Sequence, residues 1–433
     1  MKRTGFPLIF VLFILSCNSG RSPIVTNKFI DSLLSHYTIP ALARTNAIEL
    51  GFWKNKMDKE RPGLINVQNY TNALLMRYNL FGDIRDLNVC DSLINGLFRQ
   101  YGKEDQNLPL SLAGYNLKLK KLREAREWLY IANMQAQQTV EKKEVLLTLE
   151  FDVFFESGQY DSAAVVLTYL KKKVDYAYFF RLSRMEDLNG FSDSAIYHIL
   201  KAAELAKAND YQKQLALTQA AEFYIRLGNF KKANDIYRYC INLNPCDFKS
   251  ILGFGWIALT SDKDDSLSEK IFRFVVSHFK APDPLYELSL VAGSRQDENM
   301  QYKFAKDFAA VADDSIFGNR YNLELIDLYT GILHLPGRAE ILAQKETINR
   351  PSPQSFAWYS WALFKNNKKD QALQVFQRQI TGRSLDGLSA YWMGKLLKSS
   401  QQETQAALFF DSARKKPFNL SPEKRKDLEN EPG

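Results

Sequence analysis

The chain has 433 residues, a formal net charge of +8, 45% hydrophobic residues and 24% charged residues. These proportions are those of a globular protein and exclude a wholly disordered or fibrous chain. Its 21 glycines and 14 prolines together fall below the roughly 12% of an average composition, which favours helices over a turn-rich β fold. The positive charge is spread without a long Lys or Arg run, so the sequence predicts no nucleic-acid partner.

The first residues have the order of a secretory signal. Lys2 and Arg3 supply charge, residues 6–15 are apolar apart from one proline, and Ser16 precedes Cys17. The apolar stretch is shorter than the roughly 20 residues that a bilayer span needs. The string Ile-Leu-Ser-Cys that ends at Cys17 resembles the lipobox of bacterial lipoproteins. That resemblance implies cleavage after residue 16 and lipidation of Cys17, with palmitate-type chains. An ordinary cleaved signal, or an anchor with a chance cysteine, remains the alternative.

The resemblance also predicts a cellular address. Bacterial lipoproteins carry two or three acyl chains, which is what firm membrane anchoring requires. Asn18 follows the cysteine, so the acidic inner-membrane retention signal and the acidic surface-export signal of Bacteroidota lipoproteins are both missing. We therefore expect an anchor at the periplasmic face of the outer membrane rather than at the cell surface. The predicted organisation begins with a signal peptide over residues 1–16 and a lipidated linker with the first helices over 17–60.

Residues 49–62 look like the second helix of a repeat unit that ends at a proline. The clearest unit spans residues 224–245, Y-I-R-L-G-N-F-K-K-A-N-D-I-Y-R-Y-C-I-N-L-N-P. A glycine can end its first helix in a left-handed turn, a small residue lets two helices cross closely, and a proline stops the second helix. Turn, packing and stop positions are occupied by Gly228, Phe230, Ala233, Tyr237 and Pro245. This pattern resembles the tetratricopeptide repeat (TPR), a helix–turn–helix unit of about 34 residues.

The same pattern recurs along the chain. Further copies contain Gly158, Tyr160 and Ala163; Gly190 and Ala195; Ala372 and Phe376; and Ala406 and Phe410. Ten anchor positions at 87, 125, 163, 195, 233, 268, 301, 339, 372 and 406 are separated by about 35 residues on average. The turn glycine is replaced by Lys120, Asn367 and Gln401 in three copies. The resemblance implies an all-α, right-handed superhelical solenoid of ten or eleven units over residues 61–417. A polar C-terminal tail is assigned to residues 418–433, and residues 421–433 of it are expected to fray.

Motifs for chemistry are missing from the sequence. It contains no G-x-S-x-G, no phosphate-binding loop and no HExxH, and its four histidines are scattered. We therefore predict no enzymatic activity, no metal and no cofactor. Beyond the signal, the three cysteines are interpreted as isolated small apolar residues, with a Cys240–Cys246 disulfide as the alternative. Seven Asp-Ser-aliphatic strings resemble a Bacteroidota O-glycosylation sequon, but Asp and Ser are equally typical of helix starts.

The resemblance implies that the first helix of each unit lines a concave surface. Its phase predicts a partner-binding groove lined by Glu222, Arg226, Trp361, Phe364, Lys365, Tyr391, Lys395 and Lys398. Aromatic and basic side chains are typical of binding hot spots. Packing of Trp361 and Phe364 in the core is the alternative.

The predicted function is a protein-interaction scaffold or adaptor in the periplasm that binds a peptide or an envelope protein in its concave groove. One alternative is a SusD-like glycan-binding lipoprotein of a nutrient-uptake complex, which long loop-rich insertions would reveal. A second alternative is an enzyme with a divergent site in residues 262–314, where the repeat pattern is poorest.

Overall fold

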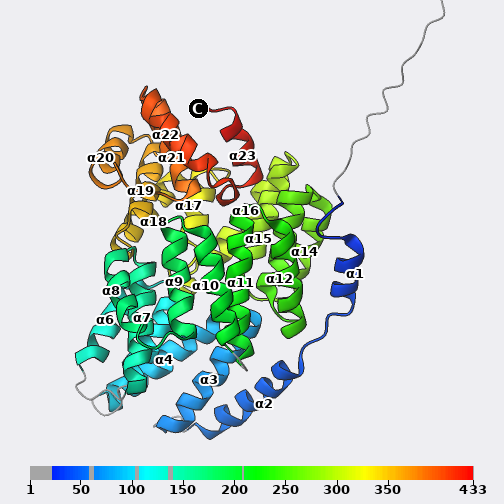
Figure 1. The fold of residues 1–433 in the computed structure, drawn as a ribbon, viewed down its shortest axis with the longest axis vertical. Coiled ribbons are helices and arrows are strands. Elements are labelled where there is room, and N and C mark those ends of the chain that lie inside the picture. The colour runs from blue at the N-terminus through cyan, green and yellow to red at the C-terminus, as the bar shows by residue number, and fades with distance from the viewer. Residues whose placement is uncertain (1–21, 58–62, 103–106, 135–139, 207–208, 433) are drawn as a thin grey trace, which may run out of the picture.

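The computed structural model describes residues 22–57, 63–102, 107–134, 140–206 and 209–432 (Figure 1). Within these ranges there are 23 α-helices, three short turns of 3₁₀ or π-helix, and no strand. The α-helices are α1 (Asn27–Ser35), α2 (Ala41–Lys56), α3 (Leu64–Phe81), α4 (Ile84–Tyr101), α5 (Asn107–Lys118), α6 (Leu122–Met134), α7 (Val140–Glu156), α8 (Tyr160–Leu170), α9 (Tyr176–Leu188), α10 (Ser192–Leu205), α11 (Asp210–Arg226), α12 (Phe230–Leu243), α13 (Phe248–Ile257), α14 (Asp265–His278), α15 (Asp283–Ser294), α16 (Glu298–Ala312), α17 (Asn322–Thr330), α18 (Pro336–Asn349), α19 (Pro353–Lys365), α20 (Lys369–Gln379), α21 (Gly387–Ser399), α22 (Glu403–Arg414) and α23 (Pro422–Glu429).

The predicted repeat is confirmed as ten helix pairs, from α3/α4 to α21/α22. Every one of the ten anchor positions is the fourth residue of the second helix in its pair. Where the anchor is alanine, its side chain is fully buried, because the two helices of the pair cross closely there. The region from 262 to 314, in which the sequence pattern is weakest, also forms regular pairs. The long insertions that would favour the SusD-like alternative are not found among the described residues.

The turns between paired helices keep one backbone conformation whether or not glycine is present. Gly158, Gly190 and Gly228 have φ of 74°, 82° and 72°. Asn367 and Gln401 adopt φ of 60° and 59° without a glycine. The left-handed turn is therefore imposed by the helix pair, at a cost of about 1–2 kcal/mol for a residue with a Cβ.

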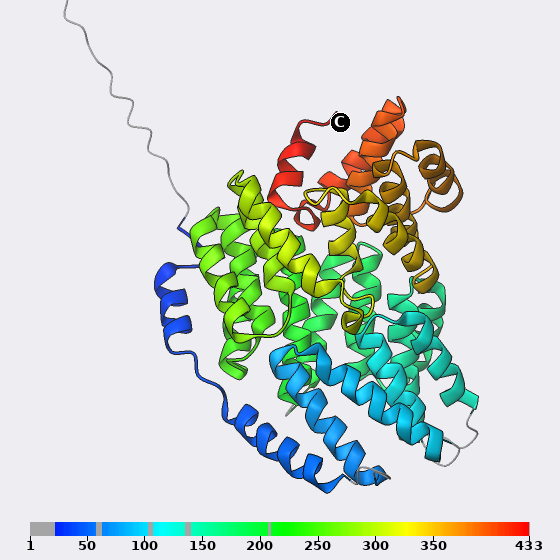
Figure 2. The same ribbon diagram turned by 180° about the vertical axis from the view of Figure 1, so that it is seen from behind.

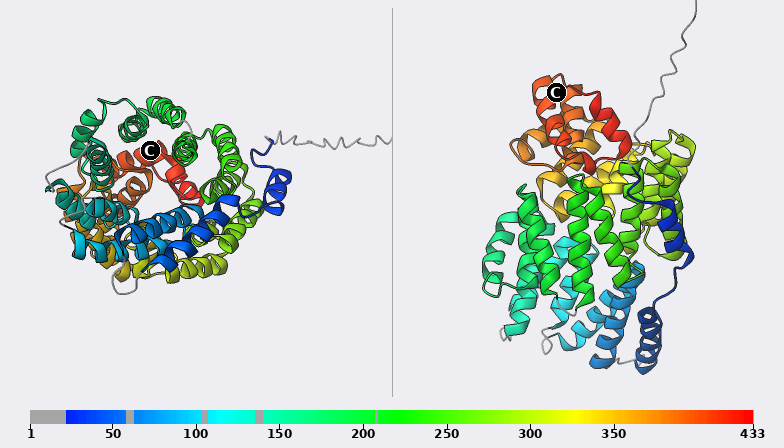
Figure 3. Two further views of the ribbon diagram at one scale, coloured as in Figure 1. Left: turned by 90° about the horizontal axis from the view of Figure 1, so that it is seen from below. Right: turned by 45° about the vertical axis from the view of Figure 1, so that its right-hand side comes forward.

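The pairs wind into a right-handed superhelix whose second turn rests on its first (Figure 3, left). The Asn349 side chain links the two turns: its Oδ1 accepts from Leu122 N at 2.8 Å, and its Nδ2 donates to Lys120 O at 2.9 Å. A further contact joins the Asn88 side chain to Ile316 O at 2.7 Å. Partners in these contacts lie more than 220 residues apart in sequence. One superhelical turn therefore closes into a ring, and the later repeats stack on the earlier ones.

Gly158 shows why the seam between the turns needs a glycine. A Cβ at this position would lie 2.4 Å from the Cβ of Ser352, which caps α19 in the second turn. The glycine therefore serves both the left-handed helix turn and the close approach of the two superhelical turns.

The segment before the repeats crosses the outside of the ring (Figure 2). Ile24 and Val25 donate their N–H groups to the Asp262 carboxylate at 3.0 and 2.9 Å. Ile30 of α1 is fully buried, and Phe29 packs edge-on against Phe254 of α13. Residues 22–37 thus form an outer strap on α12–α14.

The expectation of a frayed C-terminal tail is wrong. After α22, the chain forms a 3₁₀ turn over Pro417–Asn419 and then α23, which fall within the outline of the ring when viewed along its axis (Figure 3, left). Leu420 and Leu428 are 1% and 3% exposed and belong to the main hydrophobic core. These apolar contacts order the otherwise polar segment. We call residues 417–432 the inner segment.

Cys90, Cys240 and Cys246 are buried and free, so the alternative Cys240–Cys246 disulfide is not formed. None of the helices in the described part of the chain has the length and apolar character needed to cross a bilayer. The predicted signal and Cys17 lie outside the described residues.

Candidate functional site

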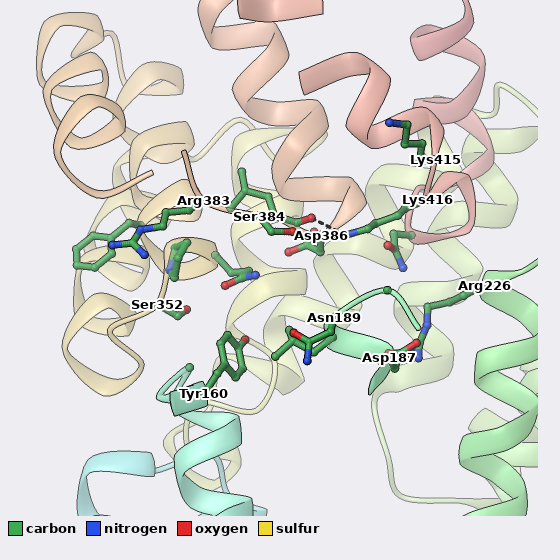
Figure 4. A pocket seen from close by; sticks show the side chains of 18 of the residues that line it. Tyr160, Asp187, Asn189, Arg226, Ser352, Arg383, Ser384, Asp386, Lys415 and Lys416 are labelled. Carbon is green, nitrogen blue, oxygen red and sulfur yellow. Dashed lines mark hydrogen bonds and ion pairs between the residues drawn. The ribbon is translucent and has the colours of Figure 1, made fainter. Parts of the chain in front are cut away.

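Two adjoining cavities occupy the interior of the ring, and we call them together the lumen. The larger has a volume of about 940 Å³ and lies between the two superhelical turns (Figure 4). The smaller, about 280 Å³, lies against α11 and α13. Arg226 and Asn419 line both cavities, so the inner segment borders each of them. The lumen therefore draws its walls from repeats that are far apart in sequence.

The wall of the larger cavity is made of helix ends. It combines the turns after α7, α9 and α11 with the start of α19 and the loop before α21. Arg226 pairs with Asp187 at 2.7 Å, and Lys416 donates to Leu385 O at 2.8 Å. Arg383 and Lys415 are exposed to the cavity and form no ion pair with any described residue. Two cations thus remain available to a ligand in a wall of otherwise mixed charge.

The smaller cavity has an aromatic and charged lining. Trp256 and Tyr237 supply the aromatic surface, and Lys249 and Glu287 supply charge. The predicted groove residues Glu222 and Arg226, one turn apart on α11, both line it. Their role in binding a partner remains a prediction.

An acidic group on α15 and α17 has unusual protonation. Burial, with a smaller contribution from the neighbouring carboxylates of Asp283 and Glu324, raises the pKa of Glu287 to about 8. Burial raises the pKa of Glu324 to about 7 as well. Glu287 Oε2 and Glu324 Oε2 are buried without a hydrogen-bond partner among the described residues. Near neutral pH these side chains are therefore partly protonated and can donate as well as accept a hydrogen bond.

A second charged cluster lies on α7 and α9. Lys120 pairs with Glu156 at 2.6 Å, and Arg184 pairs with Glu156 at 2.8 Å and with Asp152 at 2.9 Å. Burial alone would raise the pKa of Glu156, but the adjacent cations lower it to about 2. These charges neutralise one another, so the cluster offers no free charge for binding.

Three of the predicted groove residues lie beneath the inner segment. The Tyr391 hydroxyl donates to Asp427 at 2.6 Å, and Lys395 contacts Asp427 at 2.8 Å. Glu431 accepts from Lys395 at 2.7 Å and from Lys398 at 2.6 Å. Although burial opposes ionisation of both acids, the hydrogen bonds from α21 hold their pKa values below the usual range. The chain itself therefore occupies the C-terminal part of the predicted groove.

The expectation that Trp361 faces an open groove is wrong. Its side chain is 9% exposed, stacks on Trp392 at 5.6 Å, and donates from Nε1 to Thr330 Oγ1 at 3.0 Å. Phe364 is half-buried against the same ring, and Lys365 lies over it with Nζ 5.5 Å from the ring centroid. The core alternative holds for Trp361 because α19 packs between α17 and α21, whose Thr330 and Trp392 contact its indole.

Sequence reasoning missed the residues that the ring brings together. Arg383 and Lys415 lie in connecting segments outside the helical phase that defined the groove. Leu428 is the one non-proline apolar residue of α23, and acids stand before it and three residues after it. A lone leucine in a charged tail was the available signal, but nothing local shows which distant surface it meets.

Across the described ranges, no group of three or more His, Cys, Asp or Glu side chains could hold a metal ion. No family model matches the sequence, and no curated protein matches it. Solved structures do resemble the fold. A tetratricopeptide repeat protein from Parabacteroides merdae has 15% identity and a TM-score of 0.35, with 58% of this chain and 96% of that chain covered.

PilF from Pseudomonas aeruginosa has 14% identity and a TM-score of 0.32, with coverage of 52% and 100%. A Rap protein, solved in complex with competence and sporulation factor, has 11% identity and a TM-score of 0.44, with coverage of 76% and 99%. All three TM-scores are below 0.5.

Proposed function

We propose that the chain is a non-enzymatic interaction scaffold that binds a peptide or a peptide-like segment of a protein in its lumen. The observation that carries this proposal is the pair of adjoining cavities, about 940 and 280 Å³, with walls from both superhelical turns. Concave surfaces with a few convergent polar groups and aromatic side chains are where ligands bind most often.

The chemistry of the walls favours a polymer over a small metabolite. The available cations Arg383 and Lys415 both border the larger cavity, whereas the aromatic surface of Trp256 belongs to the smaller one. A ligand that contacts all three must be long enough to pass Arg226 and Asn419, where the cavities adjoin. An extended or helical peptide with an acidic part and an apolar part meets these requirements.

Site-specific photo-crosslinking in cells tests this function. A photo-reactive residue at Arg383, in the larger cavity, should yield a discrete crosslinked partner. The same residue at Tyr130, which is 68% exposed on an outer helix, is the matched control and should not. The Arg383→Glu/Lys415→Glu variant should bind the purified partner at least roughly tenfold more weakly. Equal crosslinking from both positions would contradict the proposal.

We also propose that Cys17 carries the lipid anchor and that the scaffold acts at the periplasmic face of the outer membrane. The support is the order of charge, apolar run, small residue and cysteine in residues 2–17. Cys17→Ser should abolish fatty-acid labelling and release the chain from the membrane fraction, whereas Ser19→Ala should leave both unchanged. Protease protection in intact cells distinguishes a periplasmic from a surface location.

A further inference from the structure

The inner segment contacts the lumen wall as a bound peptide would. It leaves α22 at Arg414, crosses to the first superhelical turn, and returns to the second. Phe418 packs edge-on against Phe230 at 4.9 Å, and a Cβ on Gly228 would come within 3.0 Å of the Phe418 ring. Asn419 Oδ1 then accepts from Gly387 N at 3.3 Å. The segment thus reaches from α12 to α21 without belonging to any repeat.

Four of its charged side chains, Glu423, Lys424, Asp427 and Glu431, have complementary partners on three helices. Lys424 pairs with Asp327 of α17 at 2.9 Å, and Glu423 accepts from Gln301 of α16 at 3.2 Å. Asp427 and Glu431 are held by Tyr391, Lys395 and Lys398 of α21, as described above. Such complementary pairing is the pattern of an interface that selects its occupant by charge.

Two leucines supply the apolar anchors. Leu420 precedes α23 and Leu428 lies in its last turn, and both are almost fully buried. The Arg414 guanidinium donates to the carbonyls of Leu428 at 3.4 Å and Glu431 at 2.6 Å, so it holds the end of the helix. Anchors in pockets surrounded by matched charges are how amphipathic helices are recognised in grooves.

The helix itself is not a stable unit. α23 has eight residues, PEKRKDLE, and isolated helices shorter than about 12 residues are marginal in water. The wall therefore orders it, and it can leave without breaking the pairing of any repeat. Its exit would also remove Asn419, which lines both cavities, from the boundary between them.

From these contacts we propose that the surface formed by α15, α16, α17 and α21 is a groove for an amphipathic helical peptide, and that the inner segment occupies it as a tethered, displaceable ligand. The segment defines the partner chemistry: a leucine with a lysine four residues before it, an aspartate immediately before it and a glutamate three residues after it. A partner segment with this pattern takes the groove by exchange. This inference deepens the proposed function and rests on it only for the existence of a partner.

The test uses a fluorescent peptide with the sequence of residues 417–432 and the purified full-length chain. A tethered ligand acts at millimolar effective concentration and should block the free peptide. The Leu428→Asp variant loses its own anchor, so it should bind the peptide at least about tenfold more tightly than the natural chain does. Adding Lys395→Glu and Lys398→Glu should abolish that binding. A peptide with Asp427→Lys and Glu431→Lys should restore it.

Failure of the Leu428→Asp chain to bind the peptide while it remains folded would overturn the proposal. Hydrogen exchange on the natural chain supplies a second measurement. Backbone amides of α23 should exchange at least about tenfold faster than those of α22, because the segment opens without the repeats. Equal protection of the two helices, or unfolding of the whole chain by Leu428→Asp, would show a fixed structural element and overturn the proposal. These measurements need no cellular partner, so their failure is distinct from failure of the crosslinking experiment.

Discussion

The outer strap and the inner segment are both extensions of the repeat array, and both contact repeats far from their own position in sequence. The strap is held by backbone hydrogen bonds to Asp262 and by fully buried apolar side chains such as Ile30. The inner segment has two buried leucines and a partly buried Phe418 that packs on Phe230, and most of its remaining contacts are ion pairs and hydrogen bonds. Apolar burial is insensitive to salt and costly to undo, whereas partly exposed ion pairs contribute little each and exchange readily. The comparison therefore separates a permanent clamp from an exchangeable one.

The core contact of α19 with α17 and α21 should show the largest effect. Trp361→Ala removes a buried indole and its bond to Thr330, so the free energy of unfolding should fall by about 3–5 kcal/mol. Urea denaturation followed by circular dichroism measures it. Tyr130→Ala, at a side chain 68% exposed, is the control and should change stability by less than about 0.5 kcal/mol. A similarly small loss of stability for Trp361→Ala would contradict the burial of this side chain and support an exposed binding role.

The strap should behave as part of the core. Ile30→Ala should lower the free energy of unfolding by about 2–4 kcal/mol, because it opens a cavity between α1 and the repeats. Ile48→Ala is the matched control, since Ile48 is 74% exposed on α2. If both variants unfold at the same urea concentration, Ile30 contributes no more to stability than an exposed side chain and the strap is not part of the core.

The Glu287 carboxyl group, which lines the smaller cavity, should make the stability of the fold depend on pH. The folded-state pKa of Glu287 is raised to about 8, above the roughly 4.3 of an unfolded chain, so the folded protein binds more protons between these values. Stability contributed by the protonated side chain is therefore complete below about pH 4 and is lost as the pH rises towards 8.

Glu287→Gln replaces the carboxyl by a neutral group of the same shape and should raise Tm by about 2–4 °C at pH 8, with no gain near pH 4. Differential scanning calorimetry at the two pH values measures the change. Glu204→Gln, at an exposed side chain, should show no such dependence. A gain that is larger at pH 4 would contradict the assignment.

Salt should give the smallest and most selective effect. Raising NaCl from about 0.05 to 0.5 M shortens the Debye length and weakens the ion pairs of Lys395, Lys398 and Lys424. Amide exchange in α23 should accelerate by about threefold to tenfold, while exchange in α1 stays within about twofold. Equal acceleration in the two helices would remove the distinction between the strap and the inner segment.

The sequence alone determined the helix pairs and their phase. A small residue at the helix crossing and a left-handed turn before it are local requirements, so they recur in the chain even where Gln401 or Asn367 replaces glycine. This locality is why every anchor alanine was placed correctly. The same local pattern limits the prediction of the site. It predicts that Trp361 lies on the first helix of its unit, but it does not show that neighbouring helices bury the indole ring.

Only the tertiary structure decided that the array closes on itself. Each repeat adds a small rotation to the superhelix, and the sum over more than 200 residues brings Asn349 onto Leu122. No local sequence pattern specifies this total rotation, because it depends on the packing of every intervening helix pair. The same closure places the polar C-terminal residues against α17 and α21, where burial of Leu428 and pairing of Asp427 and Glu431 stabilise a helix that the isolated sequence would not form.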